Sequence, residues 1–70
     1  MKPIEILNAL MSGTKVKIKE TTFKNVIEGI YNIPNNEFTV YQIEQGSVNL
    51  YNELTEEVYY EILFEDISLF

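Results

Sequence analysis

The sequence contains no cysteine and no histidine, and its basic residues are all lysine because arginine is absent as well. The lack of cysteine excludes disulfide bridges, and the lack of both residues excludes zinc fingers, Ser-His-Asp triads and Cys-His pairs. No apolar run approaches the roughly 20 residues of a membrane-spanning helix, and the amino terminus lacks the pattern of a signal peptide. We therefore expect a cytoplasmic protein without membrane contact, stabilised by packing or by self-association.

The length of 70 residues suits one domain. A domain of this size buries only about 60% of the surface that its unfolded chain exposes, which leaves a single core marginally stable. Hydrophobic residues make up 46% of the chain and charged residues 23%, as in globular rather than disordered proteins. The sequence predicts a single domain over residues 1–70, with a helix in residues 1–12 and β-structure in residues 14–70.

The charges are divided unevenly along the chain. All five lysines lie in the first 24 residues with only two acids, which gives that segment a charge of 5 − 2 = +3. The remaining 46 residues hold nine acids and no base, so they carry −9 and the whole chain −6. Either a basic strand beside acidic strands of the same molecule, or the basic edge of one copy against the acidic edge of another, would explain this division. A net-acidic chain without arginine is also poorly suited to binding a phosphate backbone.

The first segment has the pattern of a short helix. Apolar residues recur at helical spacing at Ile4, Leu7 and Met11, with Ile6 and Leu10 alongside. Pro3 suits the first turn, and Gly13 after Ser12 suits a left-handed helix end. A helix of two to three turns is not stable alone, so we expect it to pack on the rest of the chain.

After Gly13 the pattern changes to the period of two that is typical of strands. Turn residues at Pro34-Asn35-Asn36 and Gln45-Gly46 separate apolar segments, and Gly29 predicts a bulge or bend. The alternation in Val58–Phe64 predicts one apolar face of Val58, Tyr60, Ile62 and Phe64. The expected strands are Thr14–Glu20, Val26–Ile33, Glu37–Glu44, Ser47–Tyr51, Val58–Phe64 and Ile67–Phe70, with Ser47–Tyr51 either a separate strand or an extension of the one before.

These elements predict a mostly β fold. A short N-terminal helix precedes a five- or six-stranded, strongly bent antiparallel sheet or small barrel, whose open end the helix covers.

The element order resembles that of the Sm-like and SH3-like small barrels. The resemblance rests on the helix, on Gly13–Ile18, on Ile27–Phe38 and on the closing Ile62–Phe70, whose pattern is also similar to the end of YolD-like domains. It implies a second strand bent at Gly29 and an RNA pocket near the following turn. Asn35 stands near the family's Asp position and Thr39 near its Asn position, and Tyr31 or Tyr41 would supply a stacking aromatic ring.

The sequence gives little reason to expect catalysis. Glu56-Glu57 and Glu65-Asp66 are adjacent carboxylates, but neighbouring residues in a loop point apart, and such acids are usually only solvated. No phosphate-binding loop, dinucleotide fingerprint or calcium loop is present. We expect no enzymatic activity, no cofactor and no metal site.

Lysines and tyrosines are the candidate binding residues. Lys15, Lys17 and Lys19 form one basic stripe, which is either a solvated strand face or an electrostatic partner surface. Tyrosine is enriched at protein interfaces because its ring is buried while its hydroxyl stays hydrogen-bonded. Tyr41, Tyr59 and Tyr60 lie on strands with two partly apolar faces, and we expect them at a protein interface.

The function predicted from these residues is that of a non-enzymatic protein-interaction module. Its partners would be further copies of itself, joined through strand edges, and a second protein in addition. One alternative is an Sm-like RNA-binding protein that uses Tyr31, Asn35 and Thr39. Another is a small acidic inhibitor, encoded by a mobile element, whose carboxylates imitate the phosphates bound by a nucleic-acid enzyme.

Overall fold

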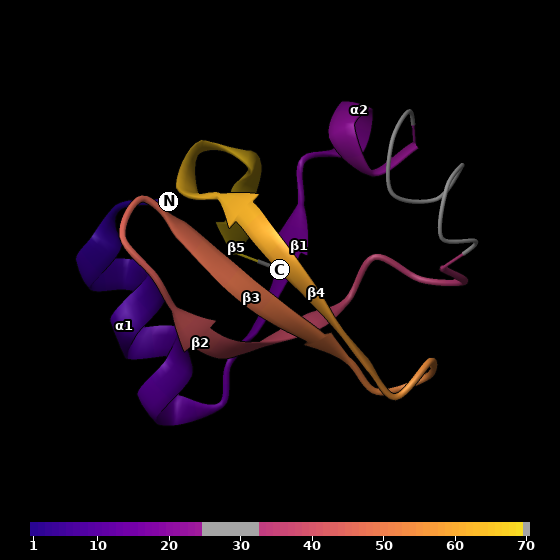
Figure 1. Cartoon of the computed structure of the whole chain (residues 1–70), viewed down its shortest axis with the longest axis horizontal. Coiled ribbons are helices and arrows are strands. Elements are labelled where there is room, and N and C mark those ends of the chain that lie inside the picture. The colour runs from indigo at the N-terminus through magenta and orange to yellow at the C-terminus, as the bar shows by residue number, and fades with distance from the viewer. Residues whose placement is uncertain (25–32, 70) are drawn as a thin grey trace.

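The computed structural model describes residues 1–24 and 33–69 (Figure 1). The elements in chain order are α1 (Pro3–Ser12), β1 (Lys15–Ile18), α2 (Glu20–Thr22), β2 (Phe38–Ile43), β3 (Ser47–Asn52), β4 (Glu57–Leu63), the 3₁₀ turn η2 (Phe64–Asp66) and β5 (Ile67–Leu69). Neither α1 nor α2, the α-helices of the described residues, is long and apolar enough to cross a membrane.

The five described strands form one antiparallel sheet in the order β4-β3-β2-β1-β5. This arrangement confirms the mostly β class with its N-terminal helix. Of the two forms that the sequence left open, the described residues form the bent sheet and do not close into a barrel. Ser47–Asn52 is a separate strand, paired with β2 on one side and β4 on the other. The strand expected at Val26–Ile33, including its bend at Gly29, lies outside the described residues except for Ile33.

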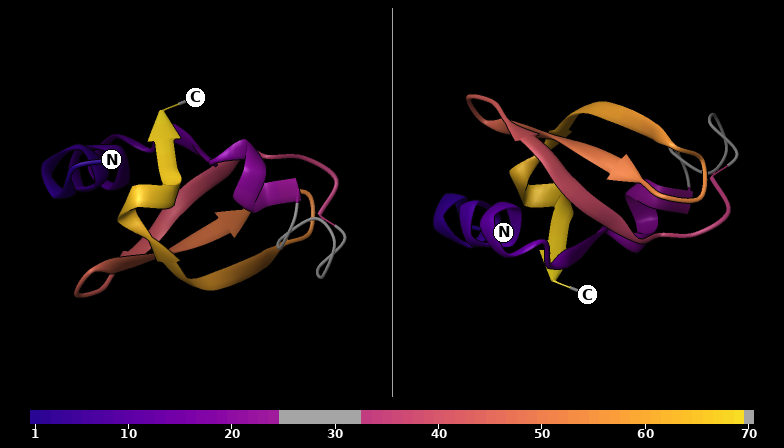
Figure 2. Two further views of the ribbon diagram at one scale, coloured as in Figure 1. Left: turned by 90° about the horizontal axis from the view of Figure 1, so that it is seen from above. Right: turned by 90° about the horizontal axis from the view of Figure 1, so that it is seen from below.

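The sheet curves around a core that α1 closes by packing against β2 (Figure 2). The core contains Ile6, Ala9, Val16, Ile18, Phe23, Ile33, Phe38, Val40, Val48, Leu50, Tyr59, Ile62 and Ile67. Phe38 lies between two other rings, edge-on to Phe23 at 6.4 Å and to Tyr59 at 6.1 Å between centroids. Such aromatic pairs add specific contacts to the area that the rings bury.

Helix α1 ends as expected and packs on the core through a narrow face. Gly13 takes the left-handed conformation at φ 72° and ends the helix. Of the apolar residues at helical spacing, Ile6 is buried together with Ala9, whereas Ile4, Leu7 and Met11 are exposed. Apolar residues surround most of this helix, and the pattern therefore did not define a single inward face.

The amino terminus is tied to the other end of the chain. The Met1 ammonium group donates hydrogen bonds to the carbonyl oxygens of Phe64 at 2.7 Å and Ile67 at 2.9 Å. These bonds join the start of α1 to the turn between β4 and β5. They hold the helix beside the edge of the sheet that β5 forms.

Candidate protein-binding surfaces

Two β-bulges flank Asn49 in the middle strand of the β2-β3-β4 ladder. On β2, Tyr41 is an extra residue without a partner on β3. On β4, the two residues Tyr60 and Glu61 lie opposite the single residue Asn49 of β3. Asn49 is 4% exposed, and its Oδ1 accepts a hydrogen bond of 3.1 Å from the Glu61 backbone N–H. Glu61 has φ 60°, in the left-handed region that non-glycine residues rarely adopt. The side-chain amide thus takes up a backbone donor that the bulge removes from the ladder.

The bulge determines which tyrosine of β4 faces the core. Tyr59 is 5% exposed, and its hydroxyl donates a hydrogen bond of 3.0 Å to Thr55. Tyr60 is 67% exposed, so the apolar face predicted for Val58–Phe64 is interrupted at this position. The expectation that Tyr59 lies at an interface is wrong, because its ring is part of the core.

The outer face of the sheet carries the exposed tyrosines. Val40 and Tyr59 point into the core, and successive residues of a strand point to opposite faces. Tyr41, which is 57% exposed, and Tyr60 therefore both face outward, on the two strands that flank β3. Two of the three tyrosines predicted for an interface are placed where a partner can reach them.

A hollow of about 480 Å³ lies beside Tyr60 on this outer face. Its lining comes from the β2–β3 hairpin and the bulge of β4, and consists of Glu44, Gln45, Ser47, Asn49, Tyr60 and Glu61. We call it the Tyr60 hollow. The five lysines are all described, and their ion pairs are Lys15–Glu53 and Lys24–Glu20, so neither carboxylate of the hollow is paired with a lysine of the same chain. No pattern in the sequence indicates this site, because it depends on the bulge.

The three lysines of the basic stripe have different surroundings. Lys15 is ion-paired with Glu53 and donates a hydrogen bond of 2.9 Å to the Thr39 hydroxyl. Lys17 and Lys19 are exposed and have no ion pair within the described chain. The ion pair of Lys15 agrees with the explanation that the basic and acidic parts of the chain meet within one molecule. Lys17 and Lys19 remain available to a partner.

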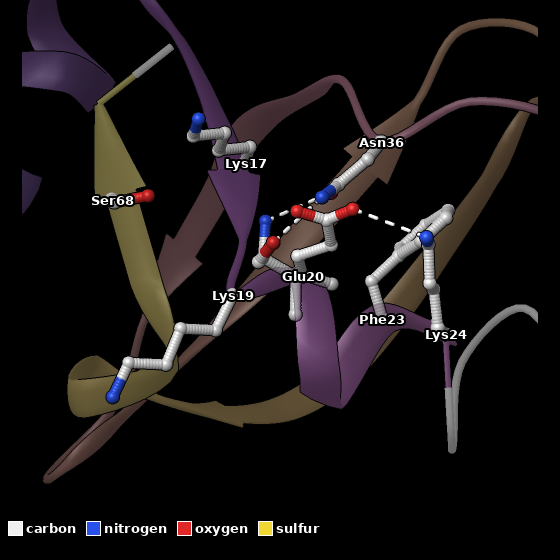
Figure 3. A pocket seen from close by; sticks show the side chains of 8 residues that line it. Lys17, Lys19, Glu20, Phe23, Lys24, Asn36 and Ser68 are labelled. Carbon is white, nitrogen blue, oxygen red and sulfur yellow. Dashed lines mark hydrogen bonds and ion pairs between the residues drawn. The ribbon is translucent and has the colours of Figure 1, made fainter.

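Lys17 and Lys19 border a groove of about 470 Å³ between β1, α2 and β5. Figure 3 shows their ammonium groups extending in different directions, so they do not converge on one anion. The groove also contains the Asn36 side chain, whose Oδ1 accepts from the Ile18 N–H at 2.8 Å and whose Nδ2 donates to the Ile18 carbonyl at 2.6 Å. This amide replaces a strand neighbour at the end of β1, and its polar atoms are engaged there.

The residues of the RNA-binding alternative are only partly brought together. Asn35 and Lys15 line one small pocket, but Glu37 and Glu53 line it too, and their charges oppose a phosphate backbone. The Asn35 Oδ1 accepts a hydrogen bond of 3.0 Å from Asn52. The Thr39 hydroxyl accepts a hydrogen bond from the Lys15 ammonium group. Tyr31 lies outside the described residues.

The described residues contain no group of three or more acidic side chains that could hold a metal ion. The adjacent pairs Glu56-Glu57 and Glu65-Asp66 lie at opposite ends of β4: Glu56 ends the turn before the strand and Glu57 begins the strand, whereas Glu65 and Asp66 lie in η2 after it. No protein-family model, no curated protein and no solved structure matches this chain, so the resemblance to Sm-like and YolD-like domains stays a prediction.

Proposed function

We propose that this protein is a non-enzymatic interaction module that associates with further copies of itself through the edges of its sheet. The observation that carries the proposal is the open strand order, which leaves β4 and β5 as the two edges in the described part of the chain. An edge strand presents unpaired backbone N–H and C=O groups, to which a strand of another molecule can add. Each molecule has a β4 edge and a β5 edge, so β4 of one molecule can pair with β5 of the next.

Side chains on the two edges are complementary. Leu63 on β4 is 47% exposed and Leu69 on β5 is 52% exposed, so pairing of the edges would bury apolar surface from both copies. Lys17 lies on β1 directly beside Ser68 of β5. Across the proposed junction, its charge would face the acidic side of β4, which carries Glu57. Such charge complementarity accelerates association and fixes the orientation of the partners.

The mass in solution tests the proposal. Size-exclusion chromatography with light scattering should give a mass that is a multiple of the 8.2 kDa chain and that falls when the salt concentration is raised. The variant Lys17→Glu/Lys19→Glu should shift the equilibrium to the monomer. The control Lys2→Glu/Lys24→Glu changes the net charge equally at two residues that lie on neither β1 nor β5, and it should keep the wild-type mass.

A wild-type protein that remains monomeric at low salt and high concentration would overturn the proposal. Equal dissociation of both charge-reversed variants would also count against it, because the effect would then depend on net charge alone.

A further inference from the structure

The Tyr60 hollow has features of a binding surface that strand-edge association does not use. It lies on the face of the sheet at the β2–β3 hairpin, whereas the proposed association uses the backbone edges of β4 and β5. An exposed aromatic ring beside a hollow offers apolar area with little conformational entropy to lose, and Tyr60 is two-thirds exposed.

The chemistry of the hollow selects a cationic occupant. Glu44 and Glu61 supply two carboxylates, and neither makes an ion pair or hydrogen bond through its side chain within the described chain. The Glu61 backbone N–H is already bonded to Asn49, which lies on the floor of the hollow. Gln45 and Ser47 add only neutral polar side chains to the lining. The charged groups open to a ligand are thus the carboxylates, which accept hydrogen bonds, and beside them lies the tyrosine ring, whose face attracts cations.

Arginine matches these groups better than lysine. Its planar guanidinium stacks on an aromatic ring and donates two parallel hydrogen bonds to a carboxylate, whereas a lysine ammonium is a compact and strongly hydrated point charge. The hollow of about 480 Å³ is within the range of pockets that hold small ligands, and is large enough for side chains from a short segment.

The molecule itself has no cation to place in the hollow. Lys15 and Lys24 are ion-paired elsewhere, and the lysine-bearing strand β1 is separated from β3 by β2. All nine residues from 25 to 70 that carry charge are acidic, so the surroundings of the hollow favour a basic partner. We propose that the Tyr60 hollow binds arginine side chains of a basic segment in a second protein.

Fluorescence anisotropy with a labelled peptide tests this inference. The probe is a twelve-residue peptide of alternating arginine and serine, titrated with the full chain at low and moderate salt. We expect saturable binding that weakens with salt, and binding several-fold weaker for the same peptide with lysine in place of arginine. Absence of binding by the arginine peptide would overturn the proposal.

Variants separate the hollow from general acidity. Glu44→Gln/Glu61→Gln should weaken binding about tenfold or more, because two charge-assisted hydrogen bonds are lost. The control Glu56→Gln/Glu65→Gln removes the same charge and is matched in backbone, since Glu56 has φ 58° and Glu61 φ 60°; it should change the affinity less than about twofold. Equal weakening by both pairs would refute a site at the hollow.

The ring is tested separately. Tyr60→Phe should keep the affinity, whereas Tyr60→Ser should reduce it about threefold to fivefold, as expected for loss of a cation–π contact. Equal affinities of the Phe and Ser variants would contradict a role for the ring. The peptide titration is independent of the mass measurement, so a monomer that binds arginine rejects strand-edge association and supports the hollow, and an oligomer that ignores the peptide does the reverse.

Discussion

Replacement of Asn49 by alanine should destabilise the protein by about 1–2 kcal/mol. The substitution removes the acceptor of the Glu61 N–H, a bond of 3.1 Å, from a position that is 4% exposed. A net hydrogen bond contributes roughly 0.5–1.5 kcal/mol, and a donor left without a partner costs about 1–3 kcal/mol. Because the Glu61 residue is itself exposed, water can replace part of the lost bond, which places the expected loss in the lower part of this range.

Urea denaturation followed by far-ultraviolet circular dichroism measures this loss. A small domain has a denaturant slope of about 1 kcal/mol/M, so the midpoint should fall by about 1–2 M. The midpoint of thermal unfolding should fall by about 4–16 °C, since each kcal/mol corresponds to about 4–8 °C at this size. The signal must come from the backbone or from tyrosine, because the chain has no tryptophan.

Gln42→Ala is the matched control for this substitution. Gln42 is the exposed cross-strand partner of Asn49, and its truncation should change the free energy of unfolding by no more than about 0.5 kcal/mol. If Asn49→Ala were as mild as Gln42→Ala, the side-chain amide would not be what stabilises the bulge, and our account of β4 would be refuted.

Two further predictions concern the same hairpin. Asn52→Ala should lower the free energy of unfolding in urea by about 2–4 kcal/mol. The fully buried amide accepts hydrogen bonds from the N–H groups of Leu54 and Thr55, and its loss leaves several polar groups unpaired. A loss below about 1 kcal/mol would contradict this. Glu61→Gly should raise the stability by about 0.5–1 kcal/mol, since it removes a left-handed penalty of about 1–2 kcal/mol and adds about 0.5–1 kcal/mol of backbone entropy. Glu56→Gly should stabilise similarly, but Glu61→Gly alone should weaken binding of the arginine peptide.

The positions of several elements could be predicted from local sequence because local chemistry determines them. Gly13 ends α1 and Gly46 turns the chain between β2 and β3, both at positive φ, where a residue without Cβ is favoured. The regular alternation of lysines and apolar residues in β1 indicates that Val16 and Ile18 face inward, and both are buried in the core. In these segments, the residues that determine the local structure lie within a few positions of it in the sequence.

The inward faces of α1 and β4 could not be predicted in this way. The alternation around Tyr59 and Tyr60 favours the wrong ring for the core, because the pattern assumes a regular strand. The bulge depends on Asn49, which is eleven residues before Tyr60 and has no special appearance in the sequence. Likewise, the ion pair of Lys15 with Glu53 joins residues 38 positions apart, so the sequence alone did not decide between internal and external pairing of the lysines.

The location of the candidate hollow follows from the same irregularity. Because Ile62 faces the core, a regular strand would turn Tyr60 inward and Tyr59 outward. The extra residue on β4 reverses this, so that Tyr59 fills the core and Tyr60 lies on the outer face beside Glu61. The chain has glycine at two other positive-φ positions, Gly13 and Gly46, yet at position 61 it has glutamate, where glycine would be the more stable choice. Glu56 has the same left-handed conformation at φ 58°, so what distinguishes Glu61 is its place beside the exposed ring of Tyr60 in the hollow. The stability that Glu61 costs and the affinity that it is proposed to supply can therefore be measured on the same substitution.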